Sequence, residues 1–185
     1  MHETDELLDL VDEQDQVVGT ILRSEFYRLE SERLGFIRGI EFLIENDNGQ
    51  LWIPTRTANK KIAPNALDYS CGGHVSAGES YIESGLREIK EELNLDLREN
   101  DLDFVHLFDP TSGLPYFRAL YRYCSNSAPQ FNTDDFVSAE WLSPEEISEQ
   151  IANGKPAKSS LAETIKYYTT WQRAQGKEHT PHNID

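Results

Sequence analysis

Short apolar runs separated by polar turns dominate the chain, and this pattern predicts more strands than helices. The runs at residues 7–11 and 17–22 are joined by polar residues and predict a β-hairpin. The run at residues 36–44 leads into an Asn-Gly dipeptide, a strong type I′ turn signal, and returns over residues 51–55. We expect further strands at residues 68–75, 104–108, 116–124 and 136–141.

Helical signals are interspersed among these strands. The clearest pattern runs over about residues 80–93, and Ser143 followed by Pro144 marks a helix start, with serine at the N-cap and proline at the first position. A short helix is expected within residues 24–33 and a last one over about residues 159–175. The mixture predicts an α/β fold in which helices cover a mixed β-sheet.

No repeat or linker divides the chain, so we expect a single domain over residues 1–176 with the first hairpin as an N-terminal extension. Residues 177–185 are expected to form a flexible polar tail.

The composition and charge of the chain limit the kinds of molecule that it could bind. The 185 residues carry a formal net charge of −16, with 38% hydrophobic residues. Such a chain repels nucleic-acid backbones, which argues against long DNA or RNA as a partner, whereas a small phosphorylated ligand fits if cations mediate the contact. No apolar run approaches the roughly 20 residues that span a bilayer. Two cysteines outside any CxxC pair, and an acidic N-terminus, favour a cytoplasmic protein with no membrane association.

Three glutamates lie close together on the helix predicted over residues 80–93. On a helical wheel, Ile82, Leu86, Ile89 and Leu93 form an apolar stripe. Beside it, an arc of roughly 100° holds Glu88, Glu91 and Glu92. Like charges at this spacing destabilise a helix by a few tenths of a kcal/mol per pair, and an oxygen-ligated cation such as Mg²⁺ would relieve that repulsion. On its own, such a face is typical of a solvated helix surface.

The spacing upstream changes the interpretation. Gly73 is followed by five residues, then Glu79, then seven residues, and then the run Arg87 to Leu95, REIKEELNL. This resembles the signature of the Nudix hydrolases, Gx5Ex7REUxEExGU with U an apolar residue. Asn94 stands where the family has glycine, and asparagine is the next best residue at a left-handed helix end.

The resemblance implies a Nudix-type α/β/α sandwich and cleavage of a nucleoside diphosphate linked to another group, with Mg²⁺ as cofactor and Mn²⁺ as the alternative. Carried over by position, the metal ligands would be Glu88, Glu91, Glu92 and the Gly73 carbonyl. Arg87 would orient a catalytic glutamate, and Glu79 would tie the loop to the helix.

The same resemblance implies which residues would be catalytic. The catalytic residues would be Glu88, as the general base, with Arg87 and Glu92. Since family members differ in the base, Asp134 and Asp135 are later candidates, with a polar turn as their plainer reading.

A second resemblance spans roughly residues 7–142 and points to the Nudix proteins related to isopentenyl-diphosphate isomerase. That enzyme places a cysteine directly before Gly-His, whereas here Gly72 and Gly73 precede His74 and Cys71 is one residue out of register. In a strand, such a slip turns the side chain to the other face. The isomerase is therefore the runner-up, and a Nudix ligand-binding module without catalysis is the third hypothesis.

Several other residues could have either a functional or a purely structural role. The candidates for binding a small-molecule diphosphate substrate are Arg56, Lys60, Lys61 and His74, although loop lysines are commonly only solvated. The strand aromatics Trp52, Tyr116 and Phe117 stack on a base or pack in the core, with the core favoured. Cys71 is expected to be a packed thiol. The last helix carries Tyr167, Tyr168 and Trp171, which predict packing, with a homodimer interface as the alternative.

Overall fold

The computed structural model describes residues 5–111 and 113–178. Its strands are β1 (Leu7–Val11), β2 (Val17–Leu22), β3 (Ile37–Glu45), β4 (Leu51–Arg56), β5 (Cys71–His74), β6 (Asp103–Phe108), β7 (Tyr116–Cys124) and β8 (Phe136–Leu142). Its α-helices are α1 (Arg28–Ser31), α2 (Tyr81–Leu93), α3 (Pro144–Ala152) and α4 (Leu161–Glu178), with 3-10 turns at Arg23–Glu25 and Glu99–Asp101.

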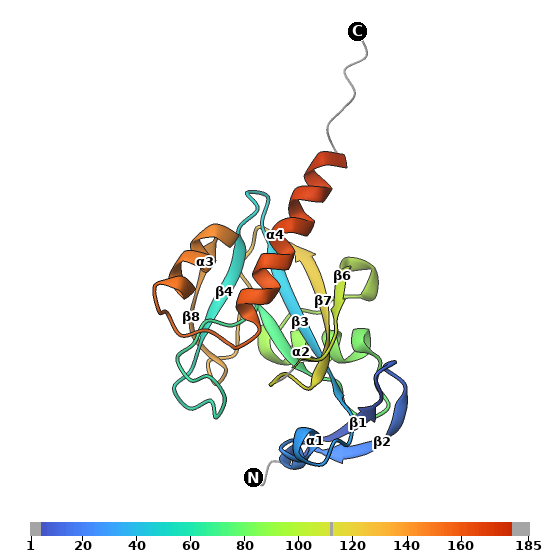
Figure 1. Ribbon diagram of the computed structural model, residues 1–185. Helices are drawn as coiled ribbons and strands as arrows, with labels where there is room; N and C mark the ends of the chain where they lie inside the picture. The colour runs from blue at the N-terminus through green and yellow to red at the C-terminus, as the bar shows by residue number, and fades with distance from the viewer. Residues whose placement is uncertain (1–4, 112, 179–185) are drawn as a thin grey trace.

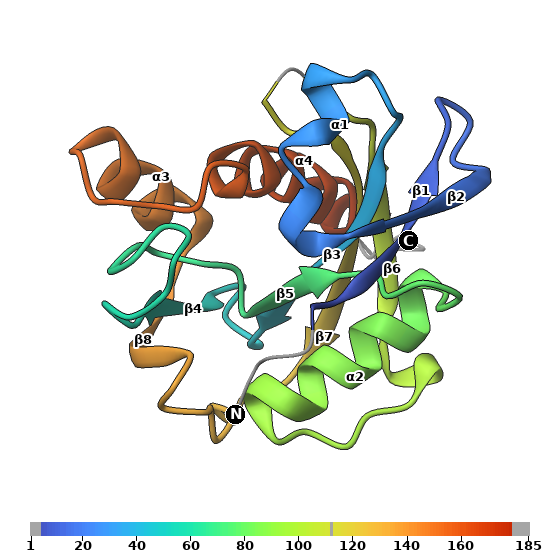
Figure 2. The ribbon, with the colours of Figure 1, turned by 90° about the horizontal axis from the view of Figure 1, so that it is seen from below.

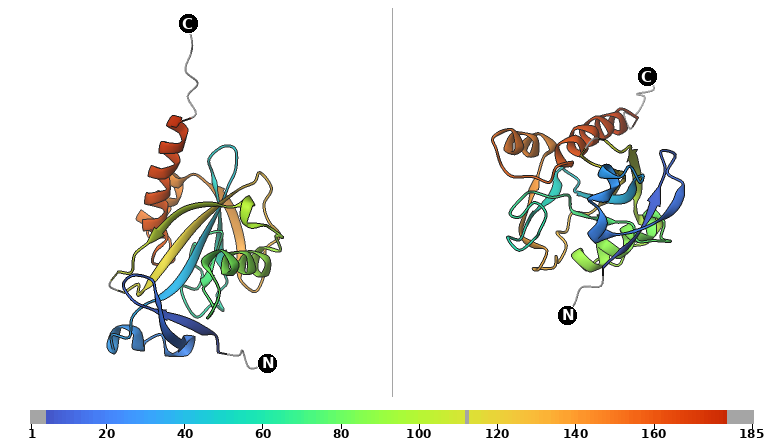
Figure 3. Two further views of the ribbon diagram at one scale, coloured as in Figure 1. Left: turned by 90° about the vertical axis from the view of Figure 1, so that its right-hand side faces the viewer. Right: turned by 60° about the horizontal axis from the view of Figure 1, so that its bottom comes forward.

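The predicted α/β/α sandwich is confirmed. Helix α2 covers one face of the main sheet, and α4, with α3 beside it, covers the other (Figures 1 and 3). The hairpin of β1 and β2 is a separate two-stranded sheet at one end of the molecule. Among the described residues, no helix is long and apolar enough to cross a membrane.

The strand order decides where the signature segment lies. The six-stranded sheet has the order β6-β7-β3-β4-β8, with β5 paired to β3. Strands β3 and β7 are parallel, whereas β3 and β4 are antiparallel and pair only at Glu45 and Leu51. Beyond that point β5 pairs with β3, from Phe42 opposite Cys71 to Gly39 opposite His74. The strand that leads into α2 is therefore joined to the main sheet through β3 and lies beside α2 (Figure 2).

Two hydrophobic clusters hold the helices to the sheet, because neighbouring residues of β3 point to opposite faces. Leu43 packs with Ile165 and Tyr168 of α4. On the other face, the cluster contains Phe42, Ile44, Cys71, Ile89 and Leu93. Burying each large apolar side chain stabilises the fold by about 1.5–3 kcal/mol, so these clusters fix the position of α2 against β5. Of the predicted apolar stripe, Ile89 and Leu93 are fully buried, and Ile82 and Leu86 partly so.

Most predicted elements are present, with three differences. The predicted strand over residues 68–75 is shorter, because residues 67–68 hydrogen-bond with Pro54 and Pro156 before β5 begins. The helix expected within residues 24–33 is a 3-10 turn followed by the one-turn helix α1.

The third difference lies at the C-terminal end. Helix α4 continues to Glu178, so residues 177–178 of the predicted tail are helical. The rest of that tail, residues 179–185, lies outside the described residues, as do residues 1–4 of the predicted domain.

We predict that Ile89→Ala lowers the free energy of unfolding by about 2–5 kcal/mol, because it opens a cavity between α2 and the sheet. Urea denaturation followed by circular dichroism measures the change. The neighbouring exposed residue supplies the control: Lys90→Ala should change the same free energy by less than about 0.5 kcal/mol. Equal effects of the two substitutions would contradict this account of the packing.

Candidate active site

The helix that carries the glutamates is capped at both ends. At its start, the Ser80 side chain accepts a hydrogen bond from the Glu83 amide and the Glu83 carboxylate accepts one from the Ser80 amide at 2.9 Å, forming a capping box. At its end, Asn94 is left-handed, with φ 53° and ψ 28°. The prediction that asparagine replaces glycine at this position is confirmed. Its side chain also donates to the Gln130 carbonyl at 2.7 Å, a contact that glycine could not make.

The N-terminal hairpin holds the loop that precedes this helix. The Ala77 amide donates to the Leu7 carbonyl at 2.8 Å, and the Gly78 amide donates to the Asp9 carboxylate at 3.1 Å. Tyr81, the first residue of α2, donates its hydroxyl to Asp15 at 3.0 Å. The extension is therefore part of the support of the loop that carries Glu79.

Arg87 is the centre of a hydrogen-bond network between the loop and the helix. Its guanidinium donates to the Glu79 carboxylate at 3.1 Å, to Glu88 at 2.7 Å, and to the Ser76 hydroxyl at 3.3 Å. Ser84 adds a second hydrogen bond to Glu79. Glu79 thus joins the loop to the helix through two donors, and Arg87 fixes one oxygen of Glu88.

The Glu88 carboxylate lies directly against the backbone of Gly73. A Cβ atom added to Gly73 would be 2.4 Å from the Glu88 Cδ, which is closer than two such atoms can approach. Glycine is therefore required at position 73 as long as Glu88 keeps this position. Burial raises the pKa of Glu88, and the hydrogen bond and charge of Arg87 oppose that shift.

Glu92 is the most perturbed acid of the site. Burial, and then the charge of Glu88, raise its pKa to about 7, although a hydrogen bond from the Cys71 thiol acts in the opposite direction. The charges of Asp135 and Asp68 also raise it. Two adjacent, half-buried carboxylates whose ionisation is disfavoured are an environment that a divalent cation would stabilise.

The structure does not gather the three glutamates of α2 around one point. The Glu91 side chain is 61% exposed and pairs with the Arg87 guanidinium at 3.6 Å. Within residues 5–111 and 113–178, no three His, Cys, Asp or Glu side chains are grouped closely enough to hold a metal ion. The physical reason is that Arg87 already neutralises Glu88, and that like charges on one helix face separate. A metal site of Glu88, Glu91 and Glu92 would need these side chains to rearrange.

Two of the three basic candidates for substrate binding are ion-paired. Arg56 donates to Asp68 at 2.5 Å, and Lys60 pairs with Asp135. Lys61 is exposed. The ion pair with Lys60 gives the Asp135 carboxylate a structural partner. The Asp135 backbone lies in a turn, which is the structural alternative that the sequence suggested for this residue.

Sequence reasoning missed Lys158 and Asp68. Lys158 contacts Asp68 at 3.3 Å, and Asp68 is buried at 2% exposure. A buried aspartate requires a partner, which is a signal that the sequence alone does not reveal.

His74 is half-buried, with its ring beside that of Phe26 at a centroid distance of 6.3 Å. Burial, followed by the charges of Arg23 and Lys158, lowers its pKa to about 3, so the imidazole is neutral at pH 7. Its backbone carbonyl faces the Arg87 guanidinium at 3.5 Å. Among the aromatic candidates, Trp52 and Phe117 are core residues, as favoured from the sequence.

Cys71 is fully buried among the apolar residues between the sheet and α2, which confirms the packed thiol. Burial also raises its pKa. Position 72, where the isomerase would have its cysteine, faces Tyr69 on the other side of the strand: a Cβ added to Gly72 would be 2.9 Å from the Tyr69 ring. The one-residue slip therefore does separate the thiol from the position that the isomerase uses.

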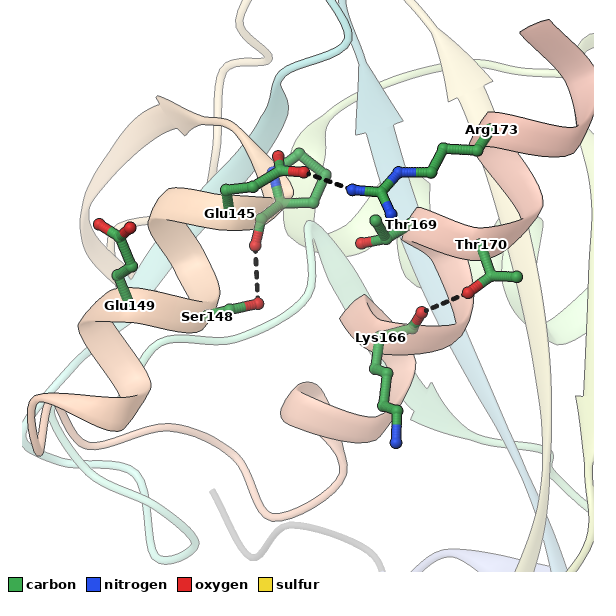
Figure 4. Close-up of a pocket in the computed structure, with 8 residues that line it drawn as sticks. Glu145, Ser148, Glu149, Lys166, Thr169, Thr170 and Arg173 are labelled. Atoms are coloured by element: carbon green, nitrogen blue, oxygen red, sulfur yellow. Dashed lines mark hydrogen bonds and ion pairs between the residues drawn. The ribbon is translucent and has the colours of Figure 1, made fainter. Parts of the chain in front are cut away.

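Two surface cavities lie away from these residues. One, of about 420 Å³, lies between α3 and α4, where Arg173 pairs with Glu145 at 3.1 Å (Figure 4). The other, of about 470 Å³, lies between α1 and the segment before β7, with Glu30 and Phe36 in its wall. Neither is lined by the residues of the signature.

Similar proteins are found both by sequence and by structure. The family model described as the NUDIX domain matches residues 36–165. A Nudix hydrolase of Deinococcus radiodurans is 42% identical over 88% of this chain and 94% of its own, and an uncharacterized Nudix hydrolase of Nostoc is 39% identical over 88% and 95%. A crystal structure of a Deinococcus radiodurans protein superposes with a TM-score of 0.77 at 40% identity, covering 87% of this chain and 98% of that one. These relatives give no support to the isomerase subgroup.

We predict that Glu92 makes the metal-free protein less stable as the pH rises. Because its pKa is raised from 4.5 to about 7, its contribution to stability is fully present below pH 4.5 and is lost as the pH rises through 7. The loss amounts to about 3 kcal/mol, which Glu92→Gln should remove. Urea denaturation in EDTA at pH 5 and pH 8 measures the difference between the two proteins. The exposed α3 variant Glu149→Gln, which should follow wild type, is the control. Parallel pH dependence of wild type and Glu92→Gln would refute the assignment.

Proposed function

Because the chain belongs to the Nudix family and is a Nudix pyrophosphohydrolase, we propose that it cleaves the diphosphate linkage of a nucleoside diphosphate joined to a second group, with Mg²⁺ as its cofactor. One observation carries the proposal: the Glu88 carboxylate lies against Gly73, held by Arg87, next to the half-buried Glu92. Carboxylates of this kind serve to bind a metal ion and to accept a proton from water.

The donor chemistry fits a hard divalent cation. Glu88 and Glu92 would hold it, with the Gly73 carbonyl beside them and Glu91 as a further ligand once its side chain turns inward. Such an ion, with Mn²⁺ as the alternative to Mg²⁺, supplies neutralisation of the phosphate oxygens and activation of a water molecule. In a protein with a net charge of −16, it also accounts for the binding of an anion.

The side chains of the protein would do the rest. Arg87 holds one oxygen of Glu88, which leaves the other carboxylate oxygen to take the proton of the attacking water. Glu88 is thus the proposed general base and Arg87 the residue that positions it. Asp135 is the weaker candidate for the base, because its carboxylate is already paired with Lys60. Asp134 is weaker again, since the contacts that define it are made by its backbone, to Asn132 and Thr57.

We assign substrate binding to Arg56, Lys60, Lys61 and His74. Arg56 and Lys60 would exchange part of their contact with the Asp68 and Asp135 carboxylates for the substrate phosphates, with Lys61 as an exposed third cation. The neutral imidazole of His74 would act as a hydrogen-bonding group rather than as a charge. Two free cysteines, one of them exposed, support a reducing cytoplasm as the location.

The aromatic residues of α4 bear on the oligomeric state of the protein. On α4, Tyr168 is fully buried, and Tyr167 and Trp171 pack partly buried against the same core. Their packing within the chain supports a monomer more than the homodimer interface that the sequence left open.

We predict that the purified protein with Mg²⁺ cleaves at least one compound of a panel of sugar nucleotides, dinucleotides and nucleoside triphosphates. Glu92→Gln should lower turnover by about 100-fold or more, because it removes a carboxylate of the metal site. Released phosphate, measured with and without added phosphatase, reports the reaction, and EDTA should abolish it. The matched control is Glu149→Gln, which removes one charge from the exposed face of α3 and should retain full turnover.

The other outcomes separate the alternatives. Retained binding of a panel compound without cleavage, in both wild type and Glu92→Gln, would indicate a ligand-binding module. Double-bond migration in isopentenyl diphosphate would revive the isomerase, against the buried position of Cys71.

A further inference from the structure

The hairpin of β1 and β2 precedes the part of the chain that matches the Nudix domain, yet it holds the loop that leads into α2. Two consecutive amides of that loop donate to the hairpin. The Ala77 amide donates to the Leu7 carbonyl at 2.8 Å, and the Gly78 amide donates to the Asp9 carboxylate at 3.1 Å. Figure 2 shows the hairpin beside this loop. The position of the loop therefore depends on the position of the hairpin.

One arginine of the main sheet fixes the hairpin at this place. Arg38 of β3 donates from Nε to the Asp15 carboxylate at 2.6 Å and from Nη2 to the Asp15 carbonyl at 2.5 Å, in the connection between β1 and β2. Its Nη1 lies 4.0 Å from the Asp9 carboxylate. The Arg38 carbonyl accepts the Val75 amide at 3.0 Å, directly before the loop. Arg38 thus binds the hairpin with its side chain and the start of the loop with its backbone.

Asp15 also reaches the start of α2. Its second carboxylate oxygen accepts the hydroxyl of Tyr81, the first residue of the helix, at 3.0 Å. The Arg38 guanidinium lies 5.4 Å from the centre of the Tyr81 ring. The side chains of Arg38 and Asp15 are only 16% and 18% exposed, so their ion pair is screened less by water than a surface pair. The loop is therefore held at its beginning and at its end by the same pair.

Hydrogen bonds connect this loop with the proposed general base. Glu79, in the loop, accepts from the Arg87 guanidinium at 3.1 Å, and Arg87 donates to Glu88 at 2.7 Å. The Ser76 hydroxyl accepts from Arg87 at 3.3 Å and donates to Glu6, directly before β1, at 3.2 Å. A shift of the loop would move both acceptors that orient Arg87. A misplacement of about 1 Å in an active site can cost on the order of 100-fold in rate.

We infer that Arg38 and Asp15 are positioning residues of the active site. Together they lock the N-terminal hairpin against the loop that carries Glu79, so that Arg87 keeps the Glu88 carboxylate in its orientation. The catalytic consequence rests on the proposed function, whereas the attachment of the loop is testable without turnover.

The first experiment is hydrogen–deuterium exchange of the metal-free protein in EDTA, resolved for single amides by NMR. The amides of Ala77 and Gly78 are the reporters, because both donate to the hairpin. Arg38→Gln should speed their exchange about 10-fold relative to the amides of β7, because it removes charge-assisted hydrogen bonds that hold the hairpin in place. Arg33→Gln, which removes an exposed arginine between the hairpin and β3, should change this ratio less than about 2-fold.

An unchanged ratio in Arg38→Gln, or an equal effect of Arg33→Gln, would overturn the inference. If Arg38→Gln fails to fold, as judged by circular dichroism, then Asp15→Asn replaces it with the same expectation. Position 15 has a left-handed backbone, with φ 60°, which asparagine tolerates. This variant therefore removes the charge of Asp15 and keeps the turn.

The second experiment uses turnover, once the panel has named a substrate. Arg38→Gln and Asp15→Asn should each lower kcat about 10-fold and change KM less than about 3-fold, because they disturb the orientation of the general base. The double variant should lose little more than either single variant, since both act through one contact. Arg33→Gln should retain full turnover.

The remaining outcomes are distinguishable. A merely structural ion pair would lower thermal stability and leave the kcat of the folded variants unchanged, which would overturn the catalytic role. Absence of turnover in wild type would reject the proposed function, and the exchange of the Ala77 and Gly78 amides would still decide whether Arg38 holds the loop.

Discussion

The contact between the Glu88 carboxylate and the backbone of Gly73 is the constraint on which the candidate site depends. It requires a residue without a Cβ in β5 and a helix packed close enough to present the carboxylate there. The close packing comes from Ile89 and Leu93, whose burial against the sheet places α2 beside β5. Arg87 then determines which way the Glu88 carboxylate turns, and Glu79 determines where Arg87 lies. The loop that carries Glu79, strand β5 and helix α2 thus all help to determine the position of the Glu88 carboxylate.

The distribution of charge follows from this constraint. Burial of Glu88 and Glu92 next to each other raises the pKa of both, and in a chain with a net charge of −16 nothing in the overall field relieves them. The cations of the site are accordingly placed around it in defined pairs, Arg87 with Glu88 and Arg56 with Asp68. A bound divalent cation would neutralise the negative charge of the glutamates and would in turn attract an anionic substrate.

One residue of strand register separates Cys71 from the position at which the isomerase has its cysteine. Cys71 points into the core beside α2, and position 72 points toward Tyr69. Because successive side chains in a strand alternate between its faces, a cysteine one position earlier cannot reach the site that the isomerase uses. The same alternation places Gly73 on the side of Glu88.

The sequence by itself determined the local features of this protein. The spacing from Gly73 to Glu92 predicted the loop and helix, and Asn94 predicted its left-handed end, because capping and periodicity depend on residues only a few positions apart. The tertiary structure alone decided how the charges are grouped. It left Glu91 exposed, engaged Lys60 with Asp135, and brought Lys158 to Asp68. Those contacts join distant segments whose proximity is set by the order of the strands and by the packing of two helical layers, and local patterns in the chain do not encode either of them.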